Sequence, residues 1–183
     1  MSIKNSNEQY GRVAIALHWI MALLIVTMII VGFSMGELPD GAEKWKVYGL
    51  HKASGLVVLA FALFRWYWML TNAKPKPLAS WTKAETGLSH ATKWLLMLLI
   101  VIMPIAGIAM SITAGKDVNF FGLFSIGGFV EKNESLAEIF HQVHKIGAIL
   151  ITIIAGLHII GALKHHFISK DDTLRRMLGR TNK

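Results

Sequence analysis

The sequence contains no cysteine among its 183 residues. This absence excludes a disulfide, a thiolate-bound iron–sulfur cluster and a haem attached through thioether bonds. Internal repeats and low-complexity tails are missing as well, so a single domain covering 1–183 is the simplest organisation. Any redox centre in this chain must therefore be held by histidine, methionine or oxygen ligands.

Charge is also scarce, since Asp, Glu, Lys and Arg make up 16% of the residues and hydrophobic residues 54%. A soluble domain of this size does not need so much apolar surface. Four apolar stretches are long enough to cross a bilayer, at about 13–35, 50–70, 92–113 and 139–163. The first is too long for the apolar region of a signal peptide. We expect an all-α fold, an integral membrane four-helix bundle.

The basic residues are distributed unevenly around these spans. The N-terminus, the linker at 71–90 and the C-terminal tail, with the span ends beside them, hold 13 of the 19 Lys and Arg but 4 of the 11 acids. The positive-inside rule therefore predicts that both termini are cytoplasmic, in a bacterial inner membrane. Topology also accounts for the net charge of +8, so no nucleic-acid partner is predicted.

Histidines lie near the ends of three of the four spans. His144 and His158 are fourteen residues apart, so they leave nearly the same face of one helix, with an axial gap of roughly 21 Å. The predicted topology puts His158 at the depth of His18 on the cytoplasmic side, and His144 at the depth of His51 on the outer side. Ionisable groups inside a membrane indicate function. We interpret the two pairs as axial ligands of the iron in two b haems.

Alternatives exist for several of these side chains. His141 competes with His144 for the outer site, but it points about 100° away from the face that carries His158. Arg65, near the cytoplasmic end of the second span, either reaches toward lipid headgroups or binds a haem propionate. A haem-free membrane protein, such as a small transporter whose histidines relay protons, is a further possibility.

Two more histidines are expected at the cytoplasmic level. His165 follows His158 by seven residues, so it lies on nearly the same helix face. It is either a plain interfacial residue or a proton donor or hydrogen-bond partner for a ligand near the inner haem. His90, at the start of the third span, has the same two interpretations.

Several segments of the chain resemble the bacterial cytochrome b561 family, and the resemblance covers essentially its whole length. They are the pair His18–Trp19, the motif at His51–Gly55, GLSHATKWLLMLLIVIMPIAGIAM at Gly87–Met110, and GLHIIGALKHHFISKDDTLRRM at Gly156–Met177. The resemblance implies a four-helix bundle that holds two b haems through His18, His51, His144 and His158. Within the family, the sequence is most similar to the superoxide-oxidising members.

The resemblance further implies a reaction. Superoxide would be oxidised to dioxygen at the outer haem, and the electrons would reduce ubiquinone near the cytoplasmic face. The family's quinone site would place His165, His90, Thr86 and Lys83 near the quinone. We expect His165 or His90 to deliver its protons from the cytoplasm.

Superoxide is an anion, so cations beside the outer haem would raise its encounter rate. Lys52 and Lys145 each directly follow an outer ligand and are candidates for this steering. The outer segments contain seven acids and six lysines, so any attraction must be local. The rival function is a cytochrome b membrane anchor that passes electrons from a partner dehydrogenase or hydrogenase to quinone. The short outer loops favour an independent protein.

Overall fold

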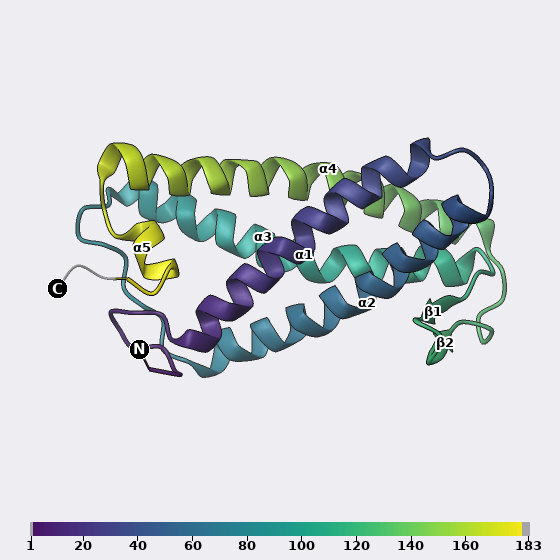
Figure 1. Ribbon diagram of the computed structural model, residues 1–183, viewed down its shortest axis with the longest axis horizontal. Helices are drawn as coiled ribbons and strands as arrows, with labels where there is room; N and C mark the ends of the chain where they lie inside the picture. Colours follow the sequence, from purple (N-terminus) through teal and green to yellow (C-terminus); the bar gives the residue numbers. More distant parts are fainter. Residues whose placement is uncertain (1, 181–183) are drawn as a thin grey trace.

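The computed structural model describes residues 2–180, which form a long bundle of four helices with a small hairpin and a short terminal helix (Figure 1). The elements in chain order are α1 (Arg12–Ser34), a 3₁₀ turn (Met35–Glu37), α2 (Ala42–Thr71), α3 (Lys83–Thr113), β1 (Val118–Phe120), β2 (Phe124–Ile126), α4 (Glu134–Lys164), a π-helical turn (His165–Ser169) and α5 (Thr173–Met177).

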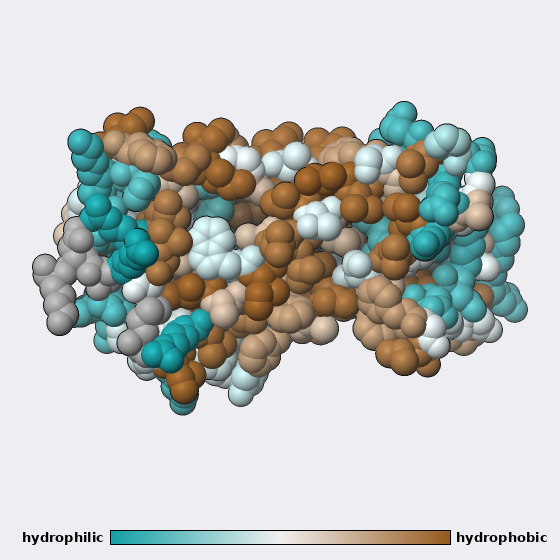
Figure 2. All heavy atoms as spheres, in the orientation of Figure 1, coloured by the Kyte–Doolittle hydropathy of each residue, from teal (hydrophilic) through white to brown (hydrophobic). Residues whose placement is uncertain are grey.

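The four long helices are each long and apolar enough to cross a membrane. Even α1, the shortest at 23 residues, extends for about 35 Å at 1.5 Å per residue, more than a hydrocarbon core of about 30 Å. Figure 2 shows a broad hydrophobic region along the middle of the bundle, with hydrophilic side chains gathered at its two ends. The expectation of four long helices is confirmed, and each is capable by length and composition of crossing a membrane.

Helices α2, α3 and α4 each begin several residues before the apolar stretch that predicted them. Helix α3 begins at Lys83 because Thr82 and Glu85 form a capping box, in which each side chain accepts a hydrogen bond from the other's backbone N–H. Asn133 caps α4 in a similar way, by accepting a hydrogen bond from the N–H of Leu136. Polar helical turns therefore extend beyond the apolar part of these spans.

The helices pack as α1 on α2, α2 on α3 and, most extensively, α3 on α4. In Figure 1, α1 crosses the bundle obliquely. The buried core lies midway along it and is built from Met21, Val58, Ala62, Met97, Leu99, Ile100 and Ile151.

The two ends of the bundle are formed by different segments of the chain. We call one the termini end, made of residues 2–11, 72–82 and 165–180, and the other the hairpin end, made of residues 35–41 and 114–133. The expectation of an all-α fold is incomplete at the hairpin end, where β1 and β2 form an antiparallel pair. Strands of three residues are too short to show an alternating pattern, so hydropathy periodicity does not predict them.

At the termini end, three segments distant in sequence are joined by hydrogen bonds. The Trp19 Nε1–H donates to the carbonyl of Met177 over 2.7 Å, and Arg176 donates to the carbonyl of Lys76 over 2.8 Å. The N–H of Lys76 donates in turn to the carbonyl of Asn7. The C-terminal segment therefore folds back over this end of the bundle.

Candidate functional site

Two pairs of histidines face each other across the bundle, one pair toward each end. The rings of His18 on α1 and His158 on α4 have centroids 6.1 Å apart, with an interplanar angle of 61°. The rings of His51 on α2 and His144 on α4 have centroids 6.3 Å apart, at 81°. The structure thus brings together the same two pairs that the sequence matched by depth, and α4 contributes one member of each.

These separations suit a metal ion held between the rings. An imidazole nitrogen lies about 2 Å from a bound metal and about 1 Å from the centroid of its own ring, so two axial imidazoles place their centroids about 6 Å apart. No group of three or more His, Asp or Glu side chains suited to a metal ion occurs in residues 2–180. A structural zinc site takes four protein ligands, whereas haem iron carries its own equatorial nitrogens. The donor set fits haem better than a bare ion.

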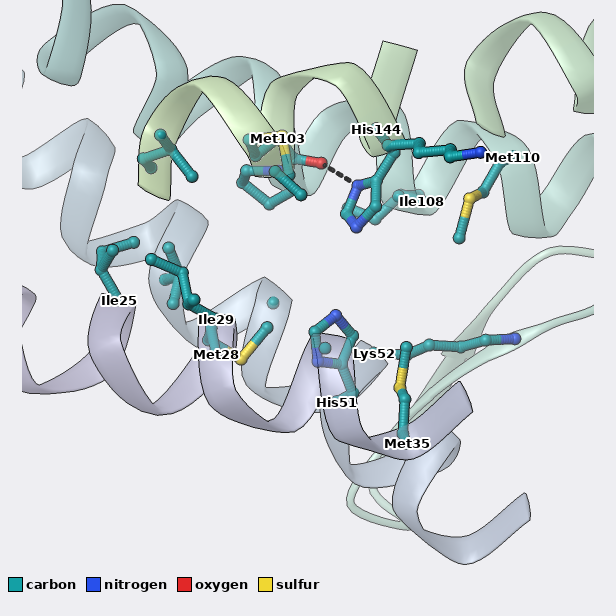
Figure 3. Close-up of a pocket in the computed structure, with 18 of the residues that line it drawn as sticks. Ile25, Met28, Ile29, Met35, His51, Lys52, Met103, Ile108, Met110 and His144 are labelled. Atoms are coloured by element: carbon teal, nitrogen blue, oxygen red, sulfur yellow. Dashed lines mark hydrogen bonds between the residues drawn. The ribbon is translucent and has the colours of Figure 1, made fainter. Parts of the chain in front are cut away.

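The pair toward the hairpin end is orientated by its surroundings. The Nδ1 of His144 lies 3.0 Å from the carbonyl oxygen of Met103, which only accepts hydrogen bonds. The proton therefore sits on Nδ1, and Nε2 is left free as a ligand. Figure 3 shows His144 and His51 projecting from opposite sides into the space between α4 and α2.

Glycines make room for both of these rings. A Cβ on Gly107 would lie 3.1 Å from Cε1 of His144, and a Cβ on Gly32 would lie 3.3 Å from Cε1 of His51. The Nδ1 of His51 is buried and finds no hydrogen-bond partner in the described chain. An unpaired buried nitrogen is costly, so the site is arranged for a group that occupies the space beside it.

That space is a cavity of about 410 Å³, within the range of about 300–1,000 Å³ that is usual for small-molecule and cofactor sites. Its lining is mostly apolar and comes from all four long helices (Figure 3). The residues beside the two histidines include Met28, Val58, Ile100, Met103, Pro104 and Ile151. A mostly apolar cavity of this kind suits the flat body of a porphyrin.

Polar residues lie between this cavity and the hairpin end. Lys52, Lys145 and His141 also line it. His141 is half exposed and lies 3.5 Å from the carboxylate of Glu138, so His144 is the residue opposite His51. Lys52 is partly buried, whereas Lys145 is exposed.

A second hollow of about 920 Å³ adjoins the cavity and shares Tyr48, Lys52 and His141 with it. It is lined by lysines and acids together, among them Lys116 and Asp117. Sequence reasoning did not find this hollow, because its lining comes from three separate segments of the chain. It provides a polar approach to the His51–His144 pair from the hairpin end.

Arg65 lies on the side of the other pair, with its side chain partly buried. Its Nε donates to the sulfur of Met97 on α3 over 3.3 Å, so the guanidinium turns into the bundle and not toward lipid. No carboxylate in residues 2–180 forms a salt bridge with it. A partly buried guanidinium without an acidic partner is suited to an anionic group such as a propionate.

His165 lies at the termini end, and its partner was not found from the sequence. The Nδ1 of His165 lies 2.6 Å from Oδ2 of Asp171, and the two side chains are only 12% and 9% exposed. Burial alone raises the pKa of Asp171, but hydrogen bonds from Thr173 and His165 outweigh it and hold that pKa below its usual value. The sequence did not predict Asp171 as the partner of His165, because their contact depends on how the C-terminal segment folds back.

The other predicted quinone residues are placed differently. His90 and Lys83 are exposed on α3, and Thr86 is partly buried in its first turns. None of the three makes a side-chain hydrogen bond or ion pair with His165 in the described chain. Within residues 2–180, no hydrogen bond or ion pair therefore joins His165 to the other three residues.

Comparison with known proteins is consistent with this arrangement. The prokaryotic cytochrome b561 family matches residues 9–180. Cytochrome b561 homolog 2 of Escherichia coli K12 is 32% identical over 184 residues, covering 100% of this chain and 97% of that protein. The probable superoxide oxidase CybB of Yersinia pestis is 29% identical, covering 94% and 97%, and cytochrome b561 homolog 1 of E. coli K12 is 26% identical, covering 94% and 98%. The chain therefore belongs to the prokaryotic cytochrome b561 family, whose members are haem b-binding electron-transfer proteins of the membrane.

Proposed function

We propose that this chain is a di-haem cytochrome of the bacterial inner membrane that oxidises superoxide to dioxygen at the periplasmic face and reduces ubiquinone near the cytoplasmic face. The observation that carries this proposal is the presence of two facing histidine pairs, whose members on α4 are fourteen residues apart. Membership of a haem b family and the name of the Yersinia pestis relative support it.

The charge distribution sets the proposed orientation. The termini end together with the helix ends beside it carries 13 of the 19 Lys and Arg but 4 of the 11 acids, so the positive-inside rule assigns this side to the cytoplasm. The His18–His158 pair then belongs to the inner haem and the His51–His144 pair to the outer haem. The hollow at the hairpin end opens toward the periplasm.

The two histidine pairs would hold the haems, and neighbouring residues would support them. Two b haems held by these pairs would supply one-electron transfer between the two faces of the membrane. The carbonyl of Met103 fixes the ring of His144, and Arg65 neutralises a propionate on the inner side. Because each iron would be held by a histidine on either side, neither substrate is expected to bind iron directly.

The substrates would approach from opposite ends. Lys52 and Lys145, which line the cavity beside His51 and His144, attract superoxide locally. Two superoxide ions lose one electron each and leave as dioxygen, and one ubiquinone takes up both electrons with two protons. His165 or His90 delivers these protons from the cytoplasm. Thr86 and Lys83 remain proposed neighbours of the quinone.

The experiment that tests this proposal mixes superoxide with the purified, oxidised protein in a stopped-flow instrument and follows the haem Soret band. We expect rapid reduction by superoxide and reoxidation when ubiquinone is present. His144→Ala and His158→Ala should each lose one of two bound haems. A purified protein without b-type absorption bands, or haems that superoxide does not reduce, would refute the proposal.

A second candidate function is the membrane anchor of a partner dehydrogenase or hydrogenase. Its specific support is the hairpin end, where large apolar side chains are exposed, namely Phe121, Leu123, Phe124 and Phe129. A docking partner would cover them. Reduction of ubiquinone by superoxide in the isolated protein separates the two functions, because an anchor subunit needs its partner.

A further inference from the structure

Four side chains from three segments meet at the termini end. Trp81 comes from the linker between α2 and α3, His165 from the π-helical turn after α4, and Asp171 and Thr173 from the segment that folds back. The reversal occurs at Lys170, whose backbone is left-handed with φ 53°, and the N–H of Asp171 donates to the carbonyl of His165. The turn itself brings the acid back onto the histidine.

The Asp171 carboxylate is fixed by donors on both oxygens. Oδ2 accepts from Nδ1 of His165 at 2.6 Å and from Nε1 of Trp81 at 3.2 Å. Oδ1 accepts from the backbone N–H of Thr173 at 2.9 Å. The indole of Trp81 also packs against the imidazole, with ring centroids 5.1 Å apart and planes at 34°. Neither the acid nor the histidine ring is free to reorientate.

This arrangement fixes which nitrogen of His165 carries the proton. An ionised carboxylate only accepts hydrogen bonds, so Nδ1 of His165 must be protonated. The neutral ring then presents Nε2 as an acceptor, and the charged ring presents an Nε2–H donor. A buried aspartate that holds an imidazole in one tautomer and stabilises its charged form is an established device in proton-transfer sites.

We infer that Asp171 is a positioning residue for proton delivery by His165, and that Trp81 holds the pair in place. This inference rests on the proposed function. His165 follows His158 by seven residues, about 10 Å along the helix, which places it on the cytoplasmic side of the inner pair. Nε2 gives its proton to a quinone oxygen and regains one from cytoplasmic water, while Asp171 stays ionised. Both electrons come from superoxide.

The neighbouring charges do not compete for this role. Lys164 pairs with Glu85 on α3 at 2.6 Å, and Arg175 pairs with Asp172 at 3.4 Å. Arg176 donates to a backbone carbonyl. Within residues 2–180, Asp171 is the only acid that pairs with His165.

The first test reads the tautomer of His165 directly and needs no activity. The protein is labelled with ¹⁵N-histidine and reduced so that both haems are diamagnetic, and the His165 signals are assigned by difference from a His165→Gln variant. We expect the neutral ring to carry its proton on Nδ1 in the wild type, and to shift toward the Nε2–H form in Asp171→Ala. A wild-type ring protonated on Nε2 would overturn the inference, even if every Asp171 variant failed to fold.

The second test measures quinone reduction as a function of pH. Asp171→Asn should lower kcat at least about tenfold, because general acid–base catalysis contributes about 10²–10⁴-fold, with KM within about twofold. Removing the anion disfavours the charged imidazole, so the alkaline limb of the profile should move to lower pH. Asp172→Asn, which alters the adjacent acid, should change neither, and the haem spectra should stay intact.

The outcomes separate this inference from the function on which it rests. If His165→Phe abolishes quinone reduction and Asp171→Asn leaves the rate and the pH profile unchanged, the inference about Asp171 is wrong and the proposed function stands. If His165→Phe itself has no effect, the proposed proton delivery by His165 fails. Loss in both variants with the predicted shift in pH supports both.

Discussion

Replacing Gly107 by alanine should disturb His144 and leave the bundle stable. The new Cβ would lie 3.1 Å from Cε1 and 3.2 Å from Nδ1 of the His144 ring, closer than ordinary van der Waals contact. The ring must shift by a few tenths of an ångström, which strains its hydrogen bond to the Met103 carbonyl. Complete loss of this hydrogen bond would lower the free energy of unfolding by about 0.5–1.5 kcal/mol. Alanine in place of glycine inside a helix raises the free energy of unfolding by about 1 kcal/mol.

The two effects on folding therefore nearly cancel, and the expected consequence is confined to the outer haem. Loss of a partner that orientates a metal ligand commonly lowers metal affinity by about 10–100-fold. We expect Gly107→Ala to weaken outer haem binding by this factor, with the inner haem unaffected. The haem-to-protein ratio and a redox titration of the haem absorbance measure the two centres separately.

Two other glycines calibrate this experiment. Gly32→Ala would place its Cβ 3.3 Å from the His51 ring, so its effect on the outer haem should be weaker. A Cβ at Gly156 on α4 meets no atom within 4 Å, so Gly156→Ala should leave both haems unchanged. If Gly107→Ala retains two haems with wild-type affinity and potentials, the assignment of His144 as a packed axial ligand is refuted.

Three further predictions follow from single side chains. Arg65→Met should lower the potential of the inner haem by roughly 60 mV in a redox titration, one tenfold step for a single electron, while Arg65→Lys should retain most of it. Lys52→Gln should slow haem reduction by superoxide about two- to tenfold and weaken its dependence on salt, unlike Lys44→Gln, which alters a lysine paired with Asp40; equal effects would contradict local steering. The pKa of Asp171 is lowered in the folded protein, so its stabilising effect is complete above its unfolded pKa of about 3.9 and declines at lower pH. The difference in melting temperature between wild type and Asp171→Asn should accordingly shrink between pH 7 and pH 3.

The features that the sequence made predictable depend on helical periodicity. Long apolar stretches predicted the four long helices. The spacing of fourteen residues from His144 to His158 predicted that both rings lie on one face of the same helix, α4. The same arithmetic turned His141 away from that face, and the structure places it half exposed beside Glu138. Regular helices allow such inferences because each residue adds a fixed rotation and rise.

Other features depend on how segments meet, which a single helix cannot reveal. The approach of Asp171 to His165 requires the left-handed turn at Lys170. The support of His144 comes from the backbone carbonyl of Met103 on the neighbouring helix α3. Such contacts become visible only when the packing of α3 on α4 is known.

The placement of one histidine of each pair on α4 has a consequence for how such a protein could evolve. The distance between the two pairs along the bundle is set by the number of residues between His144 and His158 on the single helix α4. An insertion of one residue between His144 and His158 would swing one imidazole by about 100° out of register. The smallest insertion or deletion that keeps both rings closely aligned is about two full turns, which changes the gap by about 10 Å. Under the proposed function, the distance that an electron crosses can thus be altered only in steps of whole helical turns, and not gradually.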